Sequence, residues 1–215
     1  MIDLFISAFV TLFVVIDPPG CAPIYASLTT GASAQQRRSM AIRATVIAGC
    51  ILVFFAMFGE ALLSFLHIDL DSFRIAGGIM LFIIAIDMVF EKRTERRENR
   101  AEEVISAAAA KAKSLEEEDI SVFPMAIPML AGPGSLAAIM LLAARSHSPA
   151  ETGVVLAALV AVMIITLASL LLAGPLMRLM GEKFEGALTR LLGVVLAALA
   201  AQFVVDGIKQ SFSIG

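Results

Sequence analysis

The chain has 215 residues, of which 59% are hydrophobic and 16% are charged, and its formal net charge is −3. Soluble domains average about 45–50% apolar and about 25% charged residues, and a soluble domain of this length cannot bury so much apolar surface. The composition therefore predicts an integral membrane protein. It also argues against a nucleic-acid-binding protein, because the basic residues are interleaved with acidic ones and form no cationic face.

Six hydrophobic runs are predicted to cross the bilayer as helices, a crossing that takes about 20 residues. The runs are Leu4–Leu28, Ile42–Leu66, Ile75–Phe90, Val122–Ala144, Val154–Met177 and Leu188–Ile208. The third run is short, but the charged groups of Arg74 and Glu91 can extend from its ends toward water. The predicted fold class is an all-helical membrane protein with six transmembrane helices.

Residues 91–119 form the one substantial hydrophilic segment of the chain. Thirteen of the 16 Lys and Arg residues lie in or beside the loops on the side of this segment, and three lie on the other side, namely Arg74, Arg145 and Lys209. Cytoplasmic loops carry an excess of Lys and Arg. We therefore expect residues 91–119 to be a cytoplasmic loop and both termini to lie outside. The Met1-Ile2-Asp3 start lacks the basic region of a signal peptide.

Two motifs recur at nearly one offset, which indicates an internal repeat. Gly20 and Gly134 are 114 residues apart, in the segments DPPG and AGPG, and Arg74 and Arg190 are 116 residues apart. Each half then contains three helices, and an odd number makes the second half enter the membrane from the opposite side. Inverted repeats of this kind recur in transporters, with the site between the repeats. The predicted units are residues 1–90 (first repeat), 91–119 (charged loop) and 120–215 (second, inverted repeat).

The first helix is predicted to break inside the membrane. The 13 residues from Leu4 to Ile16 cover about 20 Å of helix, so Asp17-Pro18 falls within a hydrocarbon core about 30 Å thick. Asp17 is suited to accept backbone N–H groups as an N-cap, and Pro18 is suited to the first helical position. A second half-helix is expected to start at Pro18.

The fourth helix is predicted to break at a matching depth. The segment from Phe123 to Pro128 loosens this helix, and Ala131-Gly132-Pro133-Gly134-Ser135 interrupts it. Non-helical backbone at this depth persists only where it is buried in protein or lines a wet cavity. The alternative to a binding site is a pair of proline kinks with a buried, hydrogen-bonded Asp17, and the matched placement in both halves favours a site.

The chemistry of the two breaks suits a small zwitterion. Exposed N–H groups at a half-helix N-terminus favour a carboxylate, and Asp17 or freed carbonyls can hold an ammonium group or a coupling cation. Glycines would let the backbone approach a ligand closely. The predicted substrate-binding residues are Asp17, Pro18, Gly20, Pro23, Gly132, Pro133, Gly134, Ser135 and Gln202, the last able to bond either substrate or another helix.

Other polar residues in the runs have two interpretations each. Glu60 interrupts the second run and is a candidate for ion coupling together with Asp17, although it also suits a carboxylate reaching the membrane surface. Arg74 is expected to anchor a helix end or to pair with Glu60 or Asp71. Cys21 and Cys50 are interpreted as packing thiols. We expect no cofactor and no metal site; Na⁺ or H⁺ is the possible coupling ion.

An enzyme is not favoured by any motif in the sequence. HExxH, GxSxG, a Walker lysine motif and metal-ligand spacings of Cys and His are absent. An intramembrane aspartyl protease would need Asp17 and Asp87 to share a proton. Asp17 is expected near the midplane and Asp87 near the cytoplasmic face, so we expect no catalytic residues. A passive channel, or an exporter of other small solutes, stays an open alternative.

The segments DPPGCAPIY, FPMAIPMLAGPGS, RIAGG, RLLGVV and QFVVDGI resemble the MarC family, within the LysE-like group of six-helix bacterial inner-membrane proteins. The resemblance covers the chain except its charged loop. It implies an inverted-repeat transporter with discontinuous first and fourth helices, and some relatives move small neutral amino acids such as glycine and alanine. Family members carry Asp or Asn at the position of Asp17, which implies that its oxygen matters more than its charge.

We therefore expect a secondary transporter in the inner membrane that moves small neutral amino acids by alternating access. One repeat would rock against the other around a midplane site between the first and fourth helices. Since the sequence has no nucleotide-binding motif, the energy is expected to come from an ion or substrate gradient. The expected partners are a small neutral or zwitterionic solute and the lipid bilayer, without nucleic acid.

Overall fold

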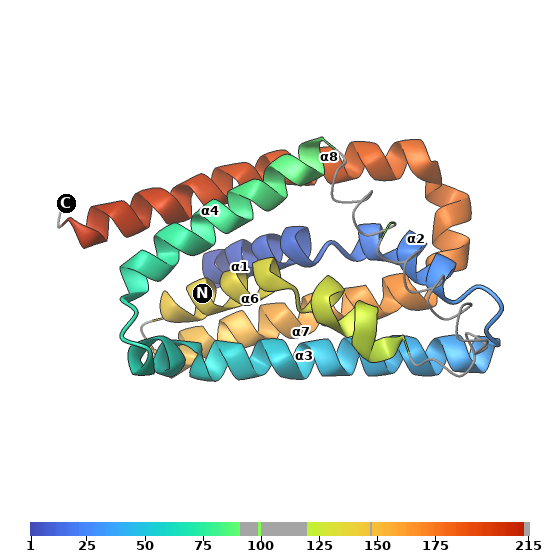
Figure 1. Ribbon diagram of the computed structural model, residues 1–215, viewed down its shortest axis with the longest axis horizontal. Coiled ribbons are helices and arrows are strands. Elements are labelled where there is room, and N and C mark those ends of the chain that lie inside the picture. Colours follow the sequence, from blue (N-terminus) through green and yellow to red (C-terminus); the bar gives the residue numbers. More distant parts are fainter. Residues whose placement is uncertain (91–98, 100–119, 147, 213–215) are drawn as a thin grey trace.

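A computed structural model describes residues 1–90, 99, 120–146 and 148–212. The predicted loop 91–119, apart from residue 99, lies outside the described residues. Within the described part the chain is helical, with short connections and no strand. Its long helices lie side by side along one axis, and both termini lie at the same end of the bundle, which we call the termini end (Figure 1).

The first half contains four helical elements. They are α1 (Ile2–Ile16), α2 (Pro18–Leu28), α3 (Ala34–Phe65) and α4 (Leu70–Val89). The start of α3 is fixed by a capping box, because Ser33 Oγ accepts the Gln36 N–H at 3.3 Å and Gln36 Oε1 accepts the Ser33 N–H at 2.8 Å. These two bonds satisfy the N–H groups of Ser33 and Gln36, which have no partner within the helix. They fix the start of α3 directly after Ser33.

The second half also contains four helical elements. They are η1 (Ser121–Leu130), α6 (Pro133–Ala144), α7 (Pro149–Leu171) and α8 (Ala173–Ser211). Helix α7 begins at an N-cap, since Ser148 Oγ accepts the Glu151 N–H at 3.3 Å. It ends at Leu171, where the sequence predicted a helix reaching Met177. Pro175 has no N–H to bond the Leu171 carbonyl, so the α7 ladder stops and α8 starts earlier than predicted.

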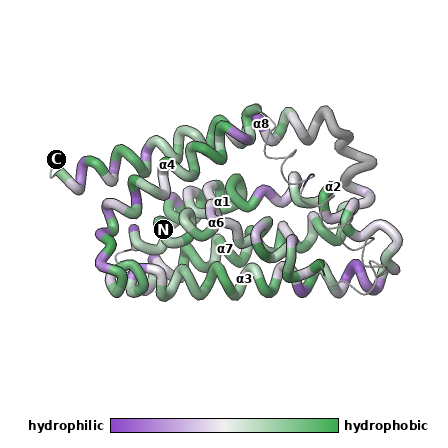
Figure 2. The backbone as a smooth tube through the Cα atoms, viewed as in Figure 1, coloured by the Kyte–Doolittle hydropathy of each residue, from purple (hydrophilic) through white to green (hydrophobic). Residues whose placement is uncertain are grey.

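Five segments of the described chain are long and apolar enough to cross a membrane. They are Ile2–Leu28, Ala34–Phe65, Leu70–Val89, Pro149–Leu171 and Gly186–Ser211. The pair of η1 and α6, bent by 54° at its break, makes a sixth. Figure 2 shows hydrophobic residues along the middle of the bundle, with a short hydrophilic interruption between α1 and α2. The expectation of six predominantly apolar helical runs is met by length and composition.

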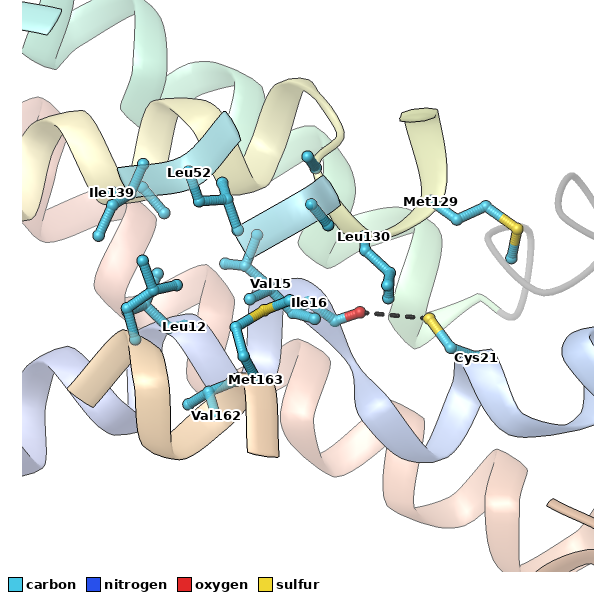
Figure 3. Packing of buried hydrophobic residues seen from close by; sticks show 14 of the residues in the cluster. Leu12, Val15, Ile16, Cys21, Leu52, Met129, Leu130, Ile139, Val162 and Met163 are labelled. Carbon is cyan, nitrogen blue, oxygen red and sulfur yellow. Dashed lines mark hydrogen bonds between the residues drawn. The ribbon is translucent and has the colours of Figure 1, made fainter. Parts of the chain in front are cut away.

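The outer surface of the bundle is apolar. Ile164, for example, is 63% exposed on α7, and Phe54 is 53% exposed on α3. The core is equally apolar: Leu12 and Val15 of α1 lie among Leu52 of α3, Ile139 of α6 and Val162 of α7, and all five are fully buried (Figure 3). A helix bundle that is hydrophobic inside and outside matches a lipid solvent rather than water.

The two halves share one core. Helix α1 packs on α7, α2 packs on α7 and α8, and α3 packs on η1, α6 and α7, while the most extensive contact joins α4 to α8. The main contacts of each half are thus made with the other half. A rigid rocking of residues 1–90 against residues 120–215 would break most of this packing, so the structure does not favour that motion.

Glycines set the closest contacts between α4 and α8. A Cβ placed on Gly78 would lie 2.9 Å from the carbonyl oxygen of Ala200, and one placed on Gly193 would lie 3.1 Å from the carbonyl oxygen of Ala85. Gly193 and Ala200 each stand 115 residues after Gly78 and Ala85. The contact is therefore reciprocal: each helix offers a glycine to the backbone of the other at corresponding positions.

Candidate functional site

The first break is organised by Asp17, which lies between α1 and α2 with φ 59° and ψ 64°. Its backbone N–H makes the last bond of α1, to the Phe13 carbonyl at 2.9 Å, and its carbonyl accepts the first bond of α2, from Cys21 N–H at 3.1 Å. Its Oδ1 accepts the Gly20 N–H at 3.2 Å. Asp tolerates this left-handed conformation better than most residues. The predicted N-cap and the predicted helix start at Pro18 are both confirmed.

The start of α2 offers no unbonded backbone donor. Pro18 and Pro19 have no N–H, the Gly20 N–H bonds Asp17 Oδ1, and the Cys21 N–H bonds the Asp17 carbonyl. This half-helix start therefore has no exposed N–H group to hold an anion. The reason is local: Pro18 and Pro19 have no N–H, the Asp17 carboxylate bonds the Gly20 N–H, and the Asp17 N–H bonds back into α1.

The same prolines leave the first break rich in acceptors. Because Pro18 and Pro19 lack N–H groups, the Val14 and Val15 carbonyls cannot receive the usual helical bond from four residues on. The Ile16 carbonyl accepts the Cys21 thiol at 3.5 Å (Figure 3). With the Asp17 carboxylate, 2% exposed, beside them, these oxygens favour a cationic group rather than an anion.

The second break is built by prolines of a different spacing. Phe123 (φ −128°, ψ 127°) and Ile127 (φ −127°, ψ 123°) are extended, because the residue before a proline disfavours helical geometry. Element η1 ends at Leu130, and Gly132 is the N-cap of α6 with Pro133 at its first position. The predicted loosening over Phe123–Pro128 is present, and the interruption predicted over Ala131–Ser135 is shorter, because α6 already begins at Pro133.

The start of α6 differs from the start of α2 because no side chain caps it. The first backbone bond of α6 runs from Leu136 N–H to the Gly132 carbonyl at 3.0 Å, so the N–H groups of Gly134 and Ser135 lie ahead of the helical ladder. Ser135, in the first turn of α6, is 3% exposed. The positive end of the α6 dipole and these donors favour an anionic group.

The two breaks lie against each other. A Cβ placed on Gly134 would lie 3.4 Å from Val15 Cγ1, just before the first break, and 2.4 Å from Ile84 Cδ1 and 3.7 Å from Leu81 Cδ2 of α4. Two segments more than 110 residues apart in the chain therefore meet inside the bundle. The acceptor-rich first break and the donor-bearing second break form one candidate site between α1, α6 and α4.

The glycines of the breaks are occupied by protein atoms rather than by open space. A Cβ on Gly20 would lie 2.3 Å from Asp17 Oδ2, and a Cβ on Gly132 would lie 2.3 Å from the Pro128 carbonyl oxygen. The expectation that these glycines clear room for a ligand is not supported, since each accommodates a neighbouring group of its own break. Gly134 likewise accommodates Ile84.

The structure places the remaining predicted site residues as follows. Pro18 is buried, Pro23 is half-buried inside α2, and Pro133 is exposed. Gln202 is exposed on α8 and donates to Asp206 Oδ1 at 2.7 Å, away from both breaks. Glu60 is exposed near the end of α3, as a surface-reaching carboxylate would be. Asp87 is two residues from the end of α4, whereas Asp17 lies in the middle of its span.

A cavity at the end opposite the termini was not predicted. Its volume is about 420 Å³, and its polar lining comes from Tyr25 of α2, Thr29 at the end of α2, Arg37 and Arg38, while the α7–α8 corner adds apolar residues. The Tyr25 hydroxyl donates to the Arg37 carbonyl. The isolated tyrosine after DPPGCAPI, followed by a basic pair, is the sequence signal that could have indicated this cavity. Among the described residues, no three His, Cys, Asp or Glu side chains gather to hold a metal ion.

Known proteins are similar to this chain over nearly its whole length. The chain is 37% identical over 205 residues to a UPF0056 membrane protein of Methanocaldococcus jannaschii, covering 95% of this chain and 96% of that protein. It is 36% identical to the UPF0056 inner membrane protein YhgN of Escherichia coli K12, covering 95% of each. No solved structure matches the chain. The model of the MarC family integral membrane proteins matches residues 2–212, and the chain belongs to this family.

Proposed function

We propose that this protein is a secondary transporter of small neutral amino acids such as glycine and alanine. The observation that carries the proposal is the meeting of two unlike helix breaks inside one membrane bundle. The first break presents the Asp17 carboxylate and carbonyl oxygens, and the second presents the backbone N–H groups of Gly134 and Ser135. An ammonium group at the first break and a carboxylate at the second would satisfy both.

The small size of the substrate follows from the packing. Val15, Leu81 and Ile84 already fill the space beside Gly134, and the Asp17 carboxylate fills the space beside Gly20. The helices must therefore separate to admit a substrate, and a small side chain requires the least separation. In this proposal Na⁺ or H⁺ supplies the energy, with Asp17 as the coupling carboxylate and the exposed Glu60 as a secondary candidate.

The proposal includes an inverted repeat. Two observations support it: the motif pairs at offsets of 114 and 116 residues, and the reciprocal glycine contacts between α4 and α8 at an offset of 115. Because the halves share one core, we propose two moving bodies that each draw helices from both halves. Helices α4 and α8, which make the most extensive contact, would move together against the spans built from α1, α3, α6 and α7.

The proposed location is the inner membrane, with residues 91–119 in the cytoplasm and both termini outside. The name of the Escherichia coli relative, an inner membrane protein, supports the location, and the distribution of Lys and Arg supports the orientation. The cavity lined by Tyr25, Arg37 and Arg38 would then be a cytoplasmic vestibule that leads along α2 toward Asp17.

Transport is favoured over catalysis by position. Asp87 lies two residues from the end of α4, while Asp17 lies at a break between two half-helices, so the two carboxylates stand at different depths. A proton-sharing dyad needs contact between them. A passive channel remains the second candidate function, and saturation of uptake separates it from a carrier.

The test is uptake of radiolabelled glycine and alanine into proteoliposomes under a sodium gradient, a proton gradient and no gradient. Gly134→Leu and Asp17→Ala are compared with wild type, and Gly153→Leu on α7 is the control because a Cβ there meets nothing within 4 Å. We expect saturable, gradient-driven uptake that the first two changes abolish and the control leaves intact.

Three results would change the proposal. No uptake of either amino acid under any gradient would exclude the substrate class. Uptake that rises linearly with concentration would indicate a channel. Saturable uptake untouched by Gly134→Leu and Asp17→Ala, in variants of unchanged thermal stability, would reduce the two motifs to proline kinks.

A further inference from the structure

A second polar cluster lies toward the termini end of the bundle, apart from the helix breaks. Arg74 of α4 is 7% exposed and donates from Nη1 to Asp71 Oδ1 at 3.0 Å. Seven residues separate Arg74 from Leu81, which packs beside Gly134, so the cluster stands about 10 Å along α4 from the second break. A substrate the size of glycine cannot contact both places at once.

In the part of this cluster on the second half, Arg145 and Gln202 both bond Asp206. The Arg145 guanidinium donates from Nη2 to Asp206 Oδ2, and Gln202 Nε2 donates to Asp206 Oδ1 at 2.7 Å. Arg145 also lies over the Phe203 ring, with its Cζ 4.4 Å from the ring centroid. Both oxygens of Asp206 are thereby engaged, and Arg145 is held in place by an ion pair and a cation–π contact.

Arg74 is bonded differently. Its Nη1 serves Asp71, whereas its Nε is buried and has no hydrogen-bond partner within the described residues. In a guanidinium the Nε–H and the Nη2 hydrogen beside it point the same way and form the fork that grips a carboxylate with two parallel bonds. Asp71 bonds Nη1, on the other side of the guanidinium, so it does not occupy the Nε–Nη2 edge. A buried arginine donor without an acceptor is the group that a ligand oxygen would satisfy.

A second cation, Arg145, lies near the Arg74 fork. Burial lowers the pKa of the Arg145 guanidinium, Asp206 partly offsets this, and the positive charge of Arg74 lowers the pKa further. The Arg74 guanidinium therefore lies near enough to disfavour the charge on Arg145. Ser146, next to Arg145, also has a buried hydroxyl oxygen without a partner in the described chain. An added anion would reduce the repulsion between the Arg74 and Arg145 guanidinium groups and would accept a hydrogen bond from the Arg74 Nε–H.

We propose that the Nε–Nη2 fork of Arg74 binds the carboxylate of a small solute, as a capture subsite ahead of the helix breaks. Asp71 orients the Arg74 guanidinium. Arg145, which is held by its ion pair with Asp206, adds a second positive charge beside the subsite. The inference rests on the proposed transport function for its physiological ligand. It predicts that substrates are recognised by their carboxylate before their ammonium group reaches Asp17.

The experiment separates the contribution of the bidentate Nε–Nη2 edge of Arg74 from the contribution of its positive charge. Arg74→Lys keeps a cation that can pair with Asp71 but removes the bidentate edge. Arg190→Lys is the matched control, because Arg190 is the residue that corresponds to Arg74 in the second half. Purified wild type and both variants are titrated calorimetrically with acetate and with glycinamide, which lacks the carboxylate, and glycine uptake is measured in proteoliposomes.

We expect wild type and Arg190→Lys to bind acetate but not glycinamide, and Arg74→Lys to bind acetate roughly tenfold or more weakly, with a matching rise in the KM for glycine. Failure of wild type to bind acetate overturns the subsite without recourse to any variant. Acetate affinity and glycine KM unchanged in Arg74→Lys also overturn it and leave the transport proposal standing. Arg74-dependent acetate binding without glycine uptake supports the subsite and removes the transport proposal.

Discussion

The two helix breaks use the same residue types to opposite effect. At the first, two adjacent prolines remove two donors at the start of α2, and Asp17 bonds the N–H of Gly20, so the start of α2 has no donor to offer. At the second, a single proline at the start of α6 and a glycine N-cap leave the N–H groups of Gly134 and Ser135 ahead of the ladder. One extra proline and one carboxylate thus convert an anion-favouring helix start into a cation-favouring one.

The breaks also differ in what restrains their glycines. A side chain on Gly20 would meet the Asp17 carboxylate, which can rotate away, whereas one on Gly132 would meet the Pro128 carbonyl of the main chain. The first break therefore depends on a side-chain bond and the second on backbone geometry. We expect the second to tolerate substitution less well, and the following predictions test this comparison from the largest effect to the smallest.

Gly132→Ala is expected to have the largest effect. Its Cβ would lie 2.3 Å from the Pro128 carbonyl oxygen, and because neither backbone can retreat without disturbing η1 or α6, we expect a loss of about 1–3 kcal/mol in the free energy of unfolding. Unfolding in detergent, followed by helical circular dichroism, measures it. Gly153→Ala, where nothing lies within 4 Å, is the control. Equal stability of the two variants would contradict a backbone-restrained break.

Asp17→Ala is expected to come second. It removes the cap on Gly20 N–H and should lower the free energy of unfolding by about 0.5–2 kcal/mol. Asp17→Asn keeps an oxygen acceptor, so we expect its stability to stay near that of wild type while ion-coupled uptake falls if the charge is used. Both are measured in the same unfolding and uptake assays. An Asn variant as unstable as the Ala variant would show that the charge, rather than the cap, holds the first break.

Ser135→Ala is expected to have the smallest effect on stability, within about 0.5 kcal/mol, because no side chain caps the start of α6 and the change therefore removes no cap. If the second break receives the substrate carboxylate, losing one hydrogen bond of about 0.5–1.5 kcal/mol should raise the KM for glycine about two- to tenfold. The kinetic assay is proteoliposome uptake at varied glycine concentration. An unchanged KM would move the carboxylate away from Ser135.

Much of this arrangement could be predicted from local sequence rules. Asp17 as N-cap, Pro18 as the first helical residue and the irregular helix through Pro124 and Pro128 all follow from missing N–H groups and from steric limits on neighbouring residues. The helix breaks were therefore predictable to within a residue. The end of α7 was not predicted correctly, because the apolar run continues past Leu171 and hid the helix-breaking effect of Pro175.

Other features depend on which helices are neighbours. Gln202 was predicted to line the site, but α8 turns it toward Asp206 and Arg145 near the termini end. An anion-favouring half-helix N-terminus was predicted without being assigned to one of the two breaks, and the bonded donors of α2 leave the start of α6 as its place. The Arg74 fork could not be predicted, since an arginine near Asp71 in sequence gives no information about which of its nitrogens is buried without a partner.

The sequence by itself determined the membrane character of the chain, its six apolar runs and the two interruptions, because hydrophobicity and proline chemistry act within a few residues. Only the tertiary structure decided that the interruptions meet, that Val15 and Ile84 close around Gly134, and that the halves share one core. Such contacts depend on the fit of side chains between helices distant in sequence, and in an apolar bundle every face is hydrophobic, so periodicity alone does not indicate which faces pair.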